Sequence, residues 1–128
     1  MKSQIKLAIA IAAGVGIGAA TVEGLHAQAK KTAIYVVAEI DVTNLDAYTK
    51  EYAPKAQGLI KKSGGKLLAA GQNVTSYEGA PPAKRVAIQF WESKDQYIAY
   101  RNTAEFKDAR KIGDKYAKFR NFSVEALP

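Results

Sequence analysis

The sequence contains no cysteine and only one histidine, His26, among its 128 residues. Without cysteine the chain forms no disulfide and has no thiolate for catalysis. His26 lies in a segment that we expect to be removed, as explained below. The remaining chain would then lack the residues for a Ser-His-Asp triad, a zinc site with the usual ligands, or a histidine-ligated haem. We therefore expect no metal and no cofactor, and most common catalytic sites are excluded.

Acidic residues are in the minority, at 12 against 19 lysines and arginines, which gives a formal net charge of +7. The basic residues are spread along the chain, and the densest groups are the pairs Lys30-Lys31 and Lys61-Lys62. An arm that binds nucleic acid has a much denser basic run. We therefore expect no nucleic-acid partner, whereas a small organic or anionic ligand would suit the sign of the charge.

The N-terminal segment has the three parts of a secretory signal in the right order. Lys2 and Lys6 provide the positive charge, and a run of 16 apolar or small residues extends from Leu7 to Val22. The sequence Ala27-Gln28-Ala29 then has the small-x-small pattern of a cleavage site. We predict a signal peptide over residues 1–29, one domain over 30–128, and a periplasmic or secreted protein.

An uncleaved membrane anchor over residues 7–22 is the alternative. A spanning helix needs about 20 apolar residues, so this run is short, and Gly14, Gly16 and Gly18 weaken it as a helix. Gly14 and Gly18 would form a G-x-x-x-G dimer face if the segment were retained. We favour cleavage, in which case the protein has no stable membrane partner.

The rest of the chain alternates between strand and helix patterns. The expected elements are a strand at 34–42, a helix capped at 43–46 and kinked at Pro54, a helix stop at Gly64-Gly65, a strand at 66–70, a short edge strand at 74–77, a strand at 84–91, a helix opened by Ser93 and broken near 102–103, and a strand at 120–127. This βαββαβ order predicts a ferredoxin-like α+β fold, with both helices on one face of an antiparallel sheet.

The alternation of each strand predicts which side chains leave the helix-covered face. Val36, Ala38 and Ile40 are expected to face the helices, as are the apolar residues of the later strands. The residues expected on the other face are Tyr35, Val37, Glu39, Arg85, Gln89, Trp91, Asn121, Ser123 and Glu125. A face of this mixed polarity suits neither open water nor a dry core. We therefore predict a homodimer that encloses it in a barrel with a partly polar lumen.

Four blocks of the sequence carry a resemblance to a known family. They are YVVAEIDVTNLDAYTKEY, KSGGKLLAAG, EGAPPAKRVAIQFWES and FRNFSVEALP. In this order they resemble the uncharacterised DUF1330 family over nearly the whole chain after the leader. The resemblance implies a dimeric α+β barrel, a fold group that also includes antibiotic-biosynthesis and haem-degrading monooxygenases and muconolactone isomerases. The haem-binding histidine of the haem-degrading proteins has no counterpart after Ala29.

The resemblance implies no reaction, because fold does not determine function. Our ligand-pocket candidates are Glu39, Arg85, Gln89 and Trp91, and Glu39 is the best candidate for a catalytic residue. In the first hypothesis the barrel lumen between subunits binds a small organic molecule without catalysis. In the alternative, a cofactor-independent monooxygenase- or isomerase-like enzyme uses Glu39 as general base while Arg85 and Gln89 stabilise an oxyanion.

Plainer roles compete with these assignments. Glu39 would then be an ion-paired strand carboxylate, with Arg85 as the expected partner, and Trp91 an anchor of the dimer interface. The sequence leaves open whether the protein is an enzyme, although we rank ligand binding without catalysis first. We expect Glu39 to point into the cavity between subunits and to contact Arg85 or Gln89.

Overall fold

The computed structural model describes residues 31–128. The predictions for the leader lie outside the described residues: its cleavage after Ala29, the alternative anchor at 7–22, the G-x-x-x-G pair and the loss of His26. Within residues 31–128 no helix is long and apolar enough to cross a membrane.

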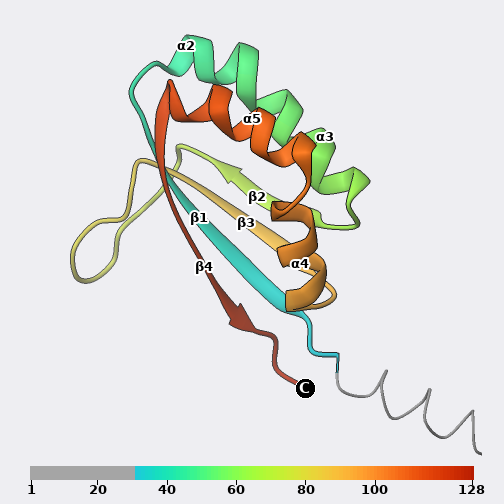
Figure 1. Cartoon of the computed structure of the whole chain (residues 1–128). Coiled ribbons are helices and arrows are strands. Elements are labelled where there is room, and N and C mark those ends of the chain that lie inside the picture. Colours follow the sequence, from blue (N-terminus) through green and yellow to red (C-terminus); the bar gives the residue numbers. More distant parts are fainter. Residues whose placement is uncertain (1–30) are drawn as a thin grey trace, which may run out of the picture. The chain divides into compact units, whose positions relative to one another are not determined.

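The described chain forms one four-stranded antiparallel sheet with helices against one face (Figure 1). Its elements in order are β1 (Ile34–Val42), α2 (Leu45–Ala47), the π-helix η1 (Tyr48–Tyr52), α3 (Ala53–Lys62), β2 (Lys66–Gly71), β3 (Arg85–Trp91), α4 (Lys94–Arg101), α5 (Ala104–Asp114) and β4 (Ala117–Glu125). The strands lie in the order β2-β3-β1-β4. This arrangement confirms the predicted ferredoxin-like α+β fold.

The central strand β1 has the two faces that its alternation predicted. Ile34, Val36, Ala38 and Ile40 are buried, because the helices cover this side of the sheet. Val36 is fully buried, and Ile34 is only 2% exposed. Burying such aliphatic side chains stabilises the fold by about 1.5–3 kcal/mol each. The helix layer is therefore held to the sheet along the whole length of β1.

Strands β3 and β4 face the opposite way from our prediction. In an antiparallel sheet, residues directly opposite each other project to the same face. Trp91 is opposite Ile34, and Ala38 is opposite both Ala87 and Asn121, so these residues face the helices. By the same alternation Arg85 and Gln89 also face the helices.

The residues that we had assigned to the helix side of these strands therefore lie on the other face. Val37 and Glu39 share this open face, which is the side of the sheet away from the helices, with the following residues of β3 and β4: Val86, Ile88, Phe90, Arg120, Phe122 and Val124. The prediction failed because β3 has apolar side chains on both faces. Alternation alone then does not define which face is covered.

The first helix begins and bends as its sequence predicts. Asn44 caps α2, because its Oδ1 accepts a hydrogen bond from the backbone N–H of Ala47 at 3.1 Å. A π-helical turn follows, in which the N–H of Ala53 donates to the carbonyl of Tyr48. Pro54 comes directly after this turn, at the start of α3. The predicted distortion is thus a π turn, a common way of interrupting the regular hydrogen-bond ladder.

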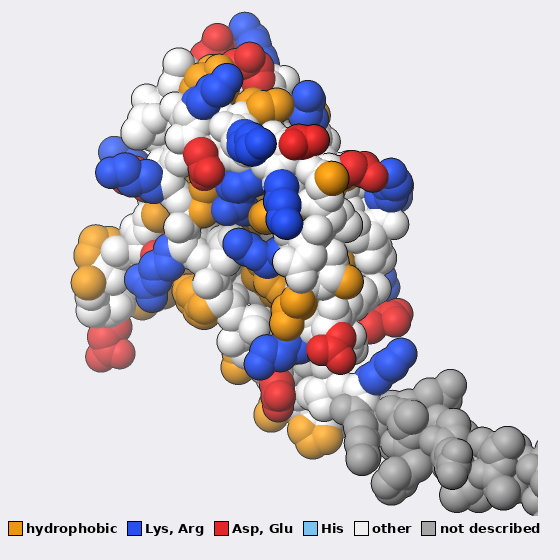
Figure 2. All heavy atoms as spheres, in the orientation of Figure 1, with side chains coloured by type: hydrophobic (Ala, Val, Ile, Leu, Met, Phe, Trp, Pro, Cys, Tyr) orange, Lys and Arg blue, Asp and Glu red, His pale blue; other side chains and the backbone are white. Residues whose placement is uncertain are grey.

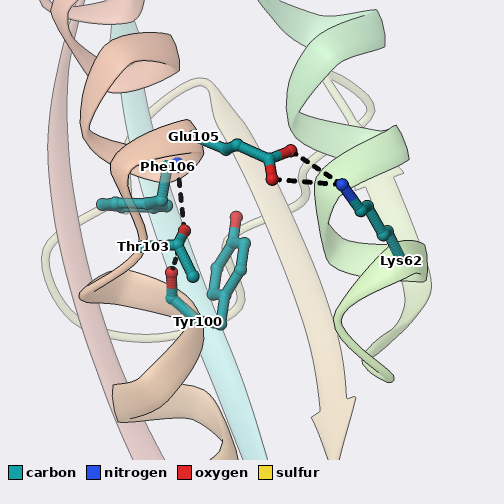
Figure 3. A network of polar contacts seen from close by, with 5 residues as sticks. All are labelled: Lys62, Tyr100, Thr103, Glu105 and Phe106. Atoms are coloured by element: carbon teal, nitrogen blue, oxygen red, sulfur yellow. Dashed lines mark hydrogen bonds and ion pairs between the residues drawn. The ribbon is translucent and has the colours of Figure 1, made fainter.

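The second helix is interrupted where predicted, between α4 and α5. The Thr103 hydroxyl donates to the carbonyl of Tyr100 at 2.8 Å and accepts from the N–H of Phe106 at 3.1 Å (Figure 3). Nearby, Glu105 accepts from Lys62 Nζ at 3.0 and 3.1 Å, which joins α5 to α3. This junction fixes the aromatic rings of Tyr100 and Phe106 with their centroids 5.0 Å apart.

The end of α3 is shaped by two glycines that serve different purposes. Gly64 has a φ of +93°, a left-handed conformation that suits glycine at a helix end. Gly65 is buried against Trp91, and a Cβ there would lie 2.6 Å from two atoms of the indole ring. Glycine therefore allows the chain to pass directly over this tryptophan.

The segment between β2 and β3 contains no strand, so the short strand predicted at residues 74–77 is wrong. The N–H of Val74 donates back to the carbonyl of Gln72 at 2.8 Å, which turns the chain out of an extended ladder. The segment instead forms a long loop that projects beside the sheet (Figure 1), and Tyr77 within it is 93% exposed.

Candidate functional site

The helices and the sheet enclose a cavity of about 60 Å³, which we call the interior cavity. A single water needs roughly 10–15 Å³ by this measure, so the cavity itself has room for several waters. The polar side chains that line it are Tyr48, Tyr52, Gln57, Arg85, Gln89, Tyr97, Tyr100, Arg110 and Asn121. The helices and strands β3 and β4 contribute these polar side chains, and apolar lining residues come from β1 and β2 as well, so the cavity depends on the complete fold.

Aromatic rings in mutual contact form much of the wall. The ring centroids of Tyr48 and Tyr52 are 5.3 Å apart, and those of Tyr52 and Phe119 are 5.5 Å apart. On another side the rings of Tyr100 and Phe106 meet edge to face. Such pairs stabilise one another by about 0.5–1.5 kcal/mol beyond burial. The cavity is therefore bordered by flat, rigid surfaces.

Arg110 of α5 adds a positive charge to this aromatic wall. Its Cζ lies 3.9 Å from the ring centroid of Phe119 and 4.9 Å from that of Phe106. These distances are typical of cation–π contacts. The Nε atom of Arg110 is buried and has no hydrogen-bond partner. Because a buried donor without a partner costs free energy, this N–H is a candidate ligand contact.

Arg85 of β3 brings a second positive charge to the same cavity. Its Cζ lies 5.3 Å from the ring centroid of Tyr48. Burial raises the pKa of the Tyr48 hydroxyl above its ordinary value, and the charges of Arg85 and Arg110 partly oppose this rise. Burial also raises the pKa of Tyr100. Both hydroxyls are therefore protonated at neutral pH and can donate hydrogen bonds.

Gln89 and Trp91 are neighbours on the helix-covered face of β3. The indole Nε1–H of Trp91 donates to Oε1 of Gln89 at 2.9 Å, and both side chains are buried. Gln89 lines the interior cavity, whereas Trp91 packs behind it against Tyr97 and Tyr100, with ring centroids 5.4 and 4.9 Å away. Trp91 is thus part of the core and does not lie on the open face, where we had expected a dimer anchor.

Glu39 lies on the opposite side of the sheet from these residues. One carboxylate oxygen accepts the backbone N–H of Ala83 at 3.1 Å, and the other is 3.4 Å from Nη1 of Arg120. The carboxylate borders an open-face groove of about 530 Å³, lined also by Val37 and Phe122. Glu39 therefore has hydrogen-bonding and ionic partners from the protein itself.

The structure brings together only some of the predicted site residues. Arg85 and Gln89 line one cavity with Trp91 behind it, whereas Glu39 stands opposite Val86 on the other face. The expected contact of Glu39 with Arg85 or Gln89 is therefore wrong. The reason is the misassigned facing of β3, which places these residues across the sheet from Glu39.

Several residues of the interior cavity were missed at the sequence level. Tyr48, Tyr100 and Arg110 all line the cavity, and none of them was among the ligand-pocket candidates. A signal was present for Arg110, because it follows Phe106 by four residues and so shares the apolar stripe of its helix. A charged residue in such a stripe indicates a polar feature inside the fold.

Residues 31–128 contain no group of three or more histidine, cysteine, aspartate or glutamate side chains placed to hold a metal ion. The chemistry offered by the interior cavity comes from guanidinium, amide and phenol groups. These groups bind and orient oxygen-bearing ligands, and they stabilise negative charge on oxygen.

Comparison with known proteins identifies a family over nearly all of the described chain. Residues 33–127 match the family model DUF1330, described as a domain of unknown function. No curated protein matches the chain.

Solved structures share the fold at low sequence identity. A protein of unknown function from Rhodopseudomonas palustris is 15% identical with a TM-score of 0.64, over 77% of this chain and 85% of that one. SnoaB, a cofactor-independent oxygenase from Streptomyces nogalater, is 11% identical with a TM-score of 0.57, over 76% and 95%. A dimeric protein of unknown function with a ferredoxin-like fold from Bacteroides fragilis is 10% identical with a TM-score of 0.52, over 73% and 96%.

Proposed function

The chain belongs to the DUF1330 family, and we propose that it binds a small planar organic molecule in the interior cavity. The observation that carries this proposal is the combination of aromatic walls with a buried, unpartnered Nε–H of Arg110. Ligand sites are typically concave and mostly apolar, with a few polar groups that fix the orientation of the ligand. The interior cavity has this composition.

The proposed ligand site lies within one subunit. At the sequence level we had expected it in a lumen between subunits. Arg85 and Gln89 face the helices of their own chain, so a ligand held by them would lie under the helix layer. The open-face groove beside Glu39 would instead be covered by a second copy of the chain.

We further propose that the protein is a homodimer formed through the open face. Tyr35, Phe122 and Val124 on this face are 38%, 46% and 61% exposed. Contiguous exposed apolar side chains are typical of association surfaces. The Bacteroides fragilis neighbour, which is described as dimeric, agrees with this proposal. We also propose that the protein is exported, on the basis of the signal sequence at residues 1–29.

A cofactor-independent oxygenase-like activity is the second candidate. Arg85 and the protonated hydroxyls of Tyr48 and Tyr100 could stabilise an enolate or phenolate oxygen in the interior cavity. Among the described residues, however, the lining includes no carboxylate or imidazole to act as a base. Glu39 could act only on a substrate in the open-face groove. Oxygen uptake with phenolic or enolic molecules that bind the protein tests this candidate, and Arg85→Gln should abolish any uptake.

A cavity-filling substitution tests the ligand site. Ala87 is buried on β3 and lines the interior cavity, so Ala87→Leu should fill it and abolish the binding of small aromatic molecules. Ala99→Leu adds the same side chain at an exposed position of α4 and should leave binding unchanged. Ligand-observed NMR with neutral and charged aromatic fragments measures both. Equal binding by the two folded variants, or no binding by the unaltered protein, would contradict the proposed site.

A further inference from the structure

The interior cavity adjoins the surface between α4 and β4. A surface hollow of about 340 Å³ shares Tyr97, Arg110, Phe119 and Asn121 with the cavity lining. The hollow adds Lys94 and Arg101 from α4. We call it the basic mouth. Figure 2 shows lysine and arginine side chains gathered on the face where α4 and α5 lie beside β4.

The space formed by the basic mouth and the interior cavity is lined by charges of one sign. Lys94, Arg101, Arg110 and Arg85 line it, and no described lining residue of either space is acidic. The ion pairs within residues 31–128 involve other basic residues, namely Lys50, Lys62 and Arg120. The positive charges in this space are therefore not neutralised by carboxylates of the described chain.

Arg101 spans the basic mouth from helix to strand. Its Nη1 donates to the hydroxyl of Tyr97 at 3.2 Å. With the Asn121 amide in the orientation that satisfies both of its ends, the Asn121 oxygen accepts from the same Nη1 at 3.1 Å. The acceptors are neutral, so the Arg101 charge is held in place without an anionic partner. Arg110 lies further in, with its buried Nε–H unpartnered.

We propose that the ligand of the interior cavity is a small organic anion, which enters through the basic mouth. The negative group would be a carboxylate or an ionised enol or phenol, held by Arg110 and Arg85 while the planar part lies against the aromatic walls. This inference rests on the proposed function and adds the charge of the ligand and its route. A planar guanidinium offers several N–H donors whose geometry matches a carboxylate, and an anion would satisfy the donor that is otherwise unpaired.

The test compares benzoate with benzamide, which have the same ring and differ in charge. Benzoate is expected to bind more tightly, and the difference should shrink at high salt because the attraction is partly screened. Arg110→Gln should weaken benzoate binding about tenfold or more, the effect of losing a hydrogen bond to a charged group, with little change for benzamide. Lys107→Gln removes one positive charge from an exposed position of the same helix and should leave both affinities unchanged.

Arg110→Lys serves as a second variant if Arg110→Gln is poorly folded by circular dichroism. It keeps the charge but loses the planar fork, so an intermediate benzoate affinity is expected. If benzoate and benzamide bound with equal affinity, and Ala87→Leu abolished the binding of both, the ligand would not need to be an anion. The proposed function would still stand. Benzoate binding that responds equally to Lys107→Gln and Arg110→Gln would also overturn it, because a diffuse surface charge would suffice. If neither compound binds, the proposed function fails together with the inference.

Discussion

Glu39 lies on the central strand β1, and its carboxylate has hydrogen-bonding and ionic partners within the same chain. The side chain is only 13% exposed, and it accepts the backbone N–H of Ala83 while facing Arg120. Since the Arg120 side chain is 75% exposed, solvent screens this ion pair, which adds at most about 1 kcal/mol. The backbone hydrogen bond joins the loop before β3 to the sheet. Glu39 thus has the features of a residue that positions this loop.

We predict that Glu39→Gln lowers the free energy of unfolding by about 1 kcal/mol, because the amide remains an acceptor but the charge is lost. Benzoate binding in the interior cavity should not change, since Glu39 lies on the other face. Urea denaturation and the NMR binding assay measure the two effects. Glu125→Gln, at an exposed position of β4, is the control. Loss of binding with unchanged stability would instead identify Glu39 as a functional residue.

The buried hydroxyl of Tyr100 should make the folded protein less stable at alkaline pH. Burial, with smaller effects of Tyr52 and Tyr97, raises its pKa above the ordinary value of 10.0 in the folded state. Near pH 10 and above, the unfolded chain loses this proton while the folded chain keeps it. The contribution of the Tyr100 hydroxyl to folding stability is therefore complete below its pKa in the unfolded chain. This contribution is lost as the pH rises toward its pKa in the folded chain. Tyr48 contributes in the same direction.

Tyr100→Phe keeps the buried ring but removes the ionisable group. The variant should lose less stability than the unaltered protein between about pH 9 and about pH 11, by up to roughly 1.4 kcal/mol per pH unit above the unfolded pKa. Urea denaturation at the two pH values provides the comparison. Tyr77→Phe is the matched control, because Tyr77 is 93% exposed. Identical pH dependence in Tyr100→Phe and the unaltered protein would show that Tyr100 is not the group responsible.

The sequence pattern predicted where the helices begin and break better than it predicted which face of the sheet the strand side chains occupy. The caps at Asn44 and Ser93 and the interruption between α4 and α5 are where local side-chain chemistry predicts them. The faces of β1 were also correct, because its polar and apolar sides differ. The faces of β3 and β4 were wrong, since Phe90 and Trp91 compete for the core and only the pairing register decides between them. Register is a tertiary property, and local alternation does not contain it.

That one error determined how much of the candidate site could be predicted. Arg85 and Gln89 were selected as ligand-pocket residues, and both line the interior cavity. The partner assigned to them, Glu39, lies across the sheet. Arg110 was missed because the cavity forms only when α5 packs against β4, and its contact with Phe119 joins positions from these two elements. Individual residue types could therefore be selected from sequence, whereas their grouping required the assembled sheet.

The cap of α5 allows a prediction at the scale of one element. Thr103→Ala removes the acceptor for the N–H of Phe106 and the donor to the carbonyl of Tyr100, so stability should fall by about 1 kcal/mol. Thr103→Ser keeps both bonds and should restore most of the loss. Urea denaturation measures each variant, with Thr75→Ala in the exposed loop as the control. If Thr103→Ala and Thr103→Ser were equally stable, the hydroxyl would not be the stabilising group.

At the scale of the whole molecule, the open face of the sheet is more apolar than the sequence predicted. Val86, Ile88 and Phe90 take the places expected for Arg85, Gln89 and Trp91. This exchange strengthens the case for a homodimer, because water meets more apolar surface on an isolated subunit. A test of association needs a residue of the open face, because a charge at the buried Trp91 would disrupt the core of one subunit.

Phe122→Lys should shift the protein from dimer toward monomer, because it places a charge on the apolar surface of the proposed interface. Phe122 is 46% exposed on the open face, and Leu45, at 47% on α2, is the matched control. Leu45→Lys should remain dimeric. Light scattering over a range of concentrations measures the mass of each variant. An unaltered protein that is monomeric throughout, or a dimeric Phe122→Lys, would refute association through this face.

Export is the second prediction for the whole molecule. The charged start, apolar run and Ala27-Gln28-Ala29 site predict that protein isolated from its native host lacks the first 29 residues. Intact-mass measurement tests this directly. Ala27→Leu should impair cleavage, because the peptidase requires a small residue there. Full-length protein in the membrane fraction of the unaltered strain would favour the anchor at residues 7–22.

The strand order also determines when the sheet can be completed as the chain is synthesised. β1 is made first, yet it lies between β3 and β4, so Ile34 meets Trp91 on one side and Glu125 on the other. Such distant pairings require long loops to close and are slow to form. The nascent chain must therefore leave one edge of β1 unpaired until nearly all of the domain has been synthesised. A fragment that stops before Ala117 would leave one edge of β1 bare, as a template for aggregation.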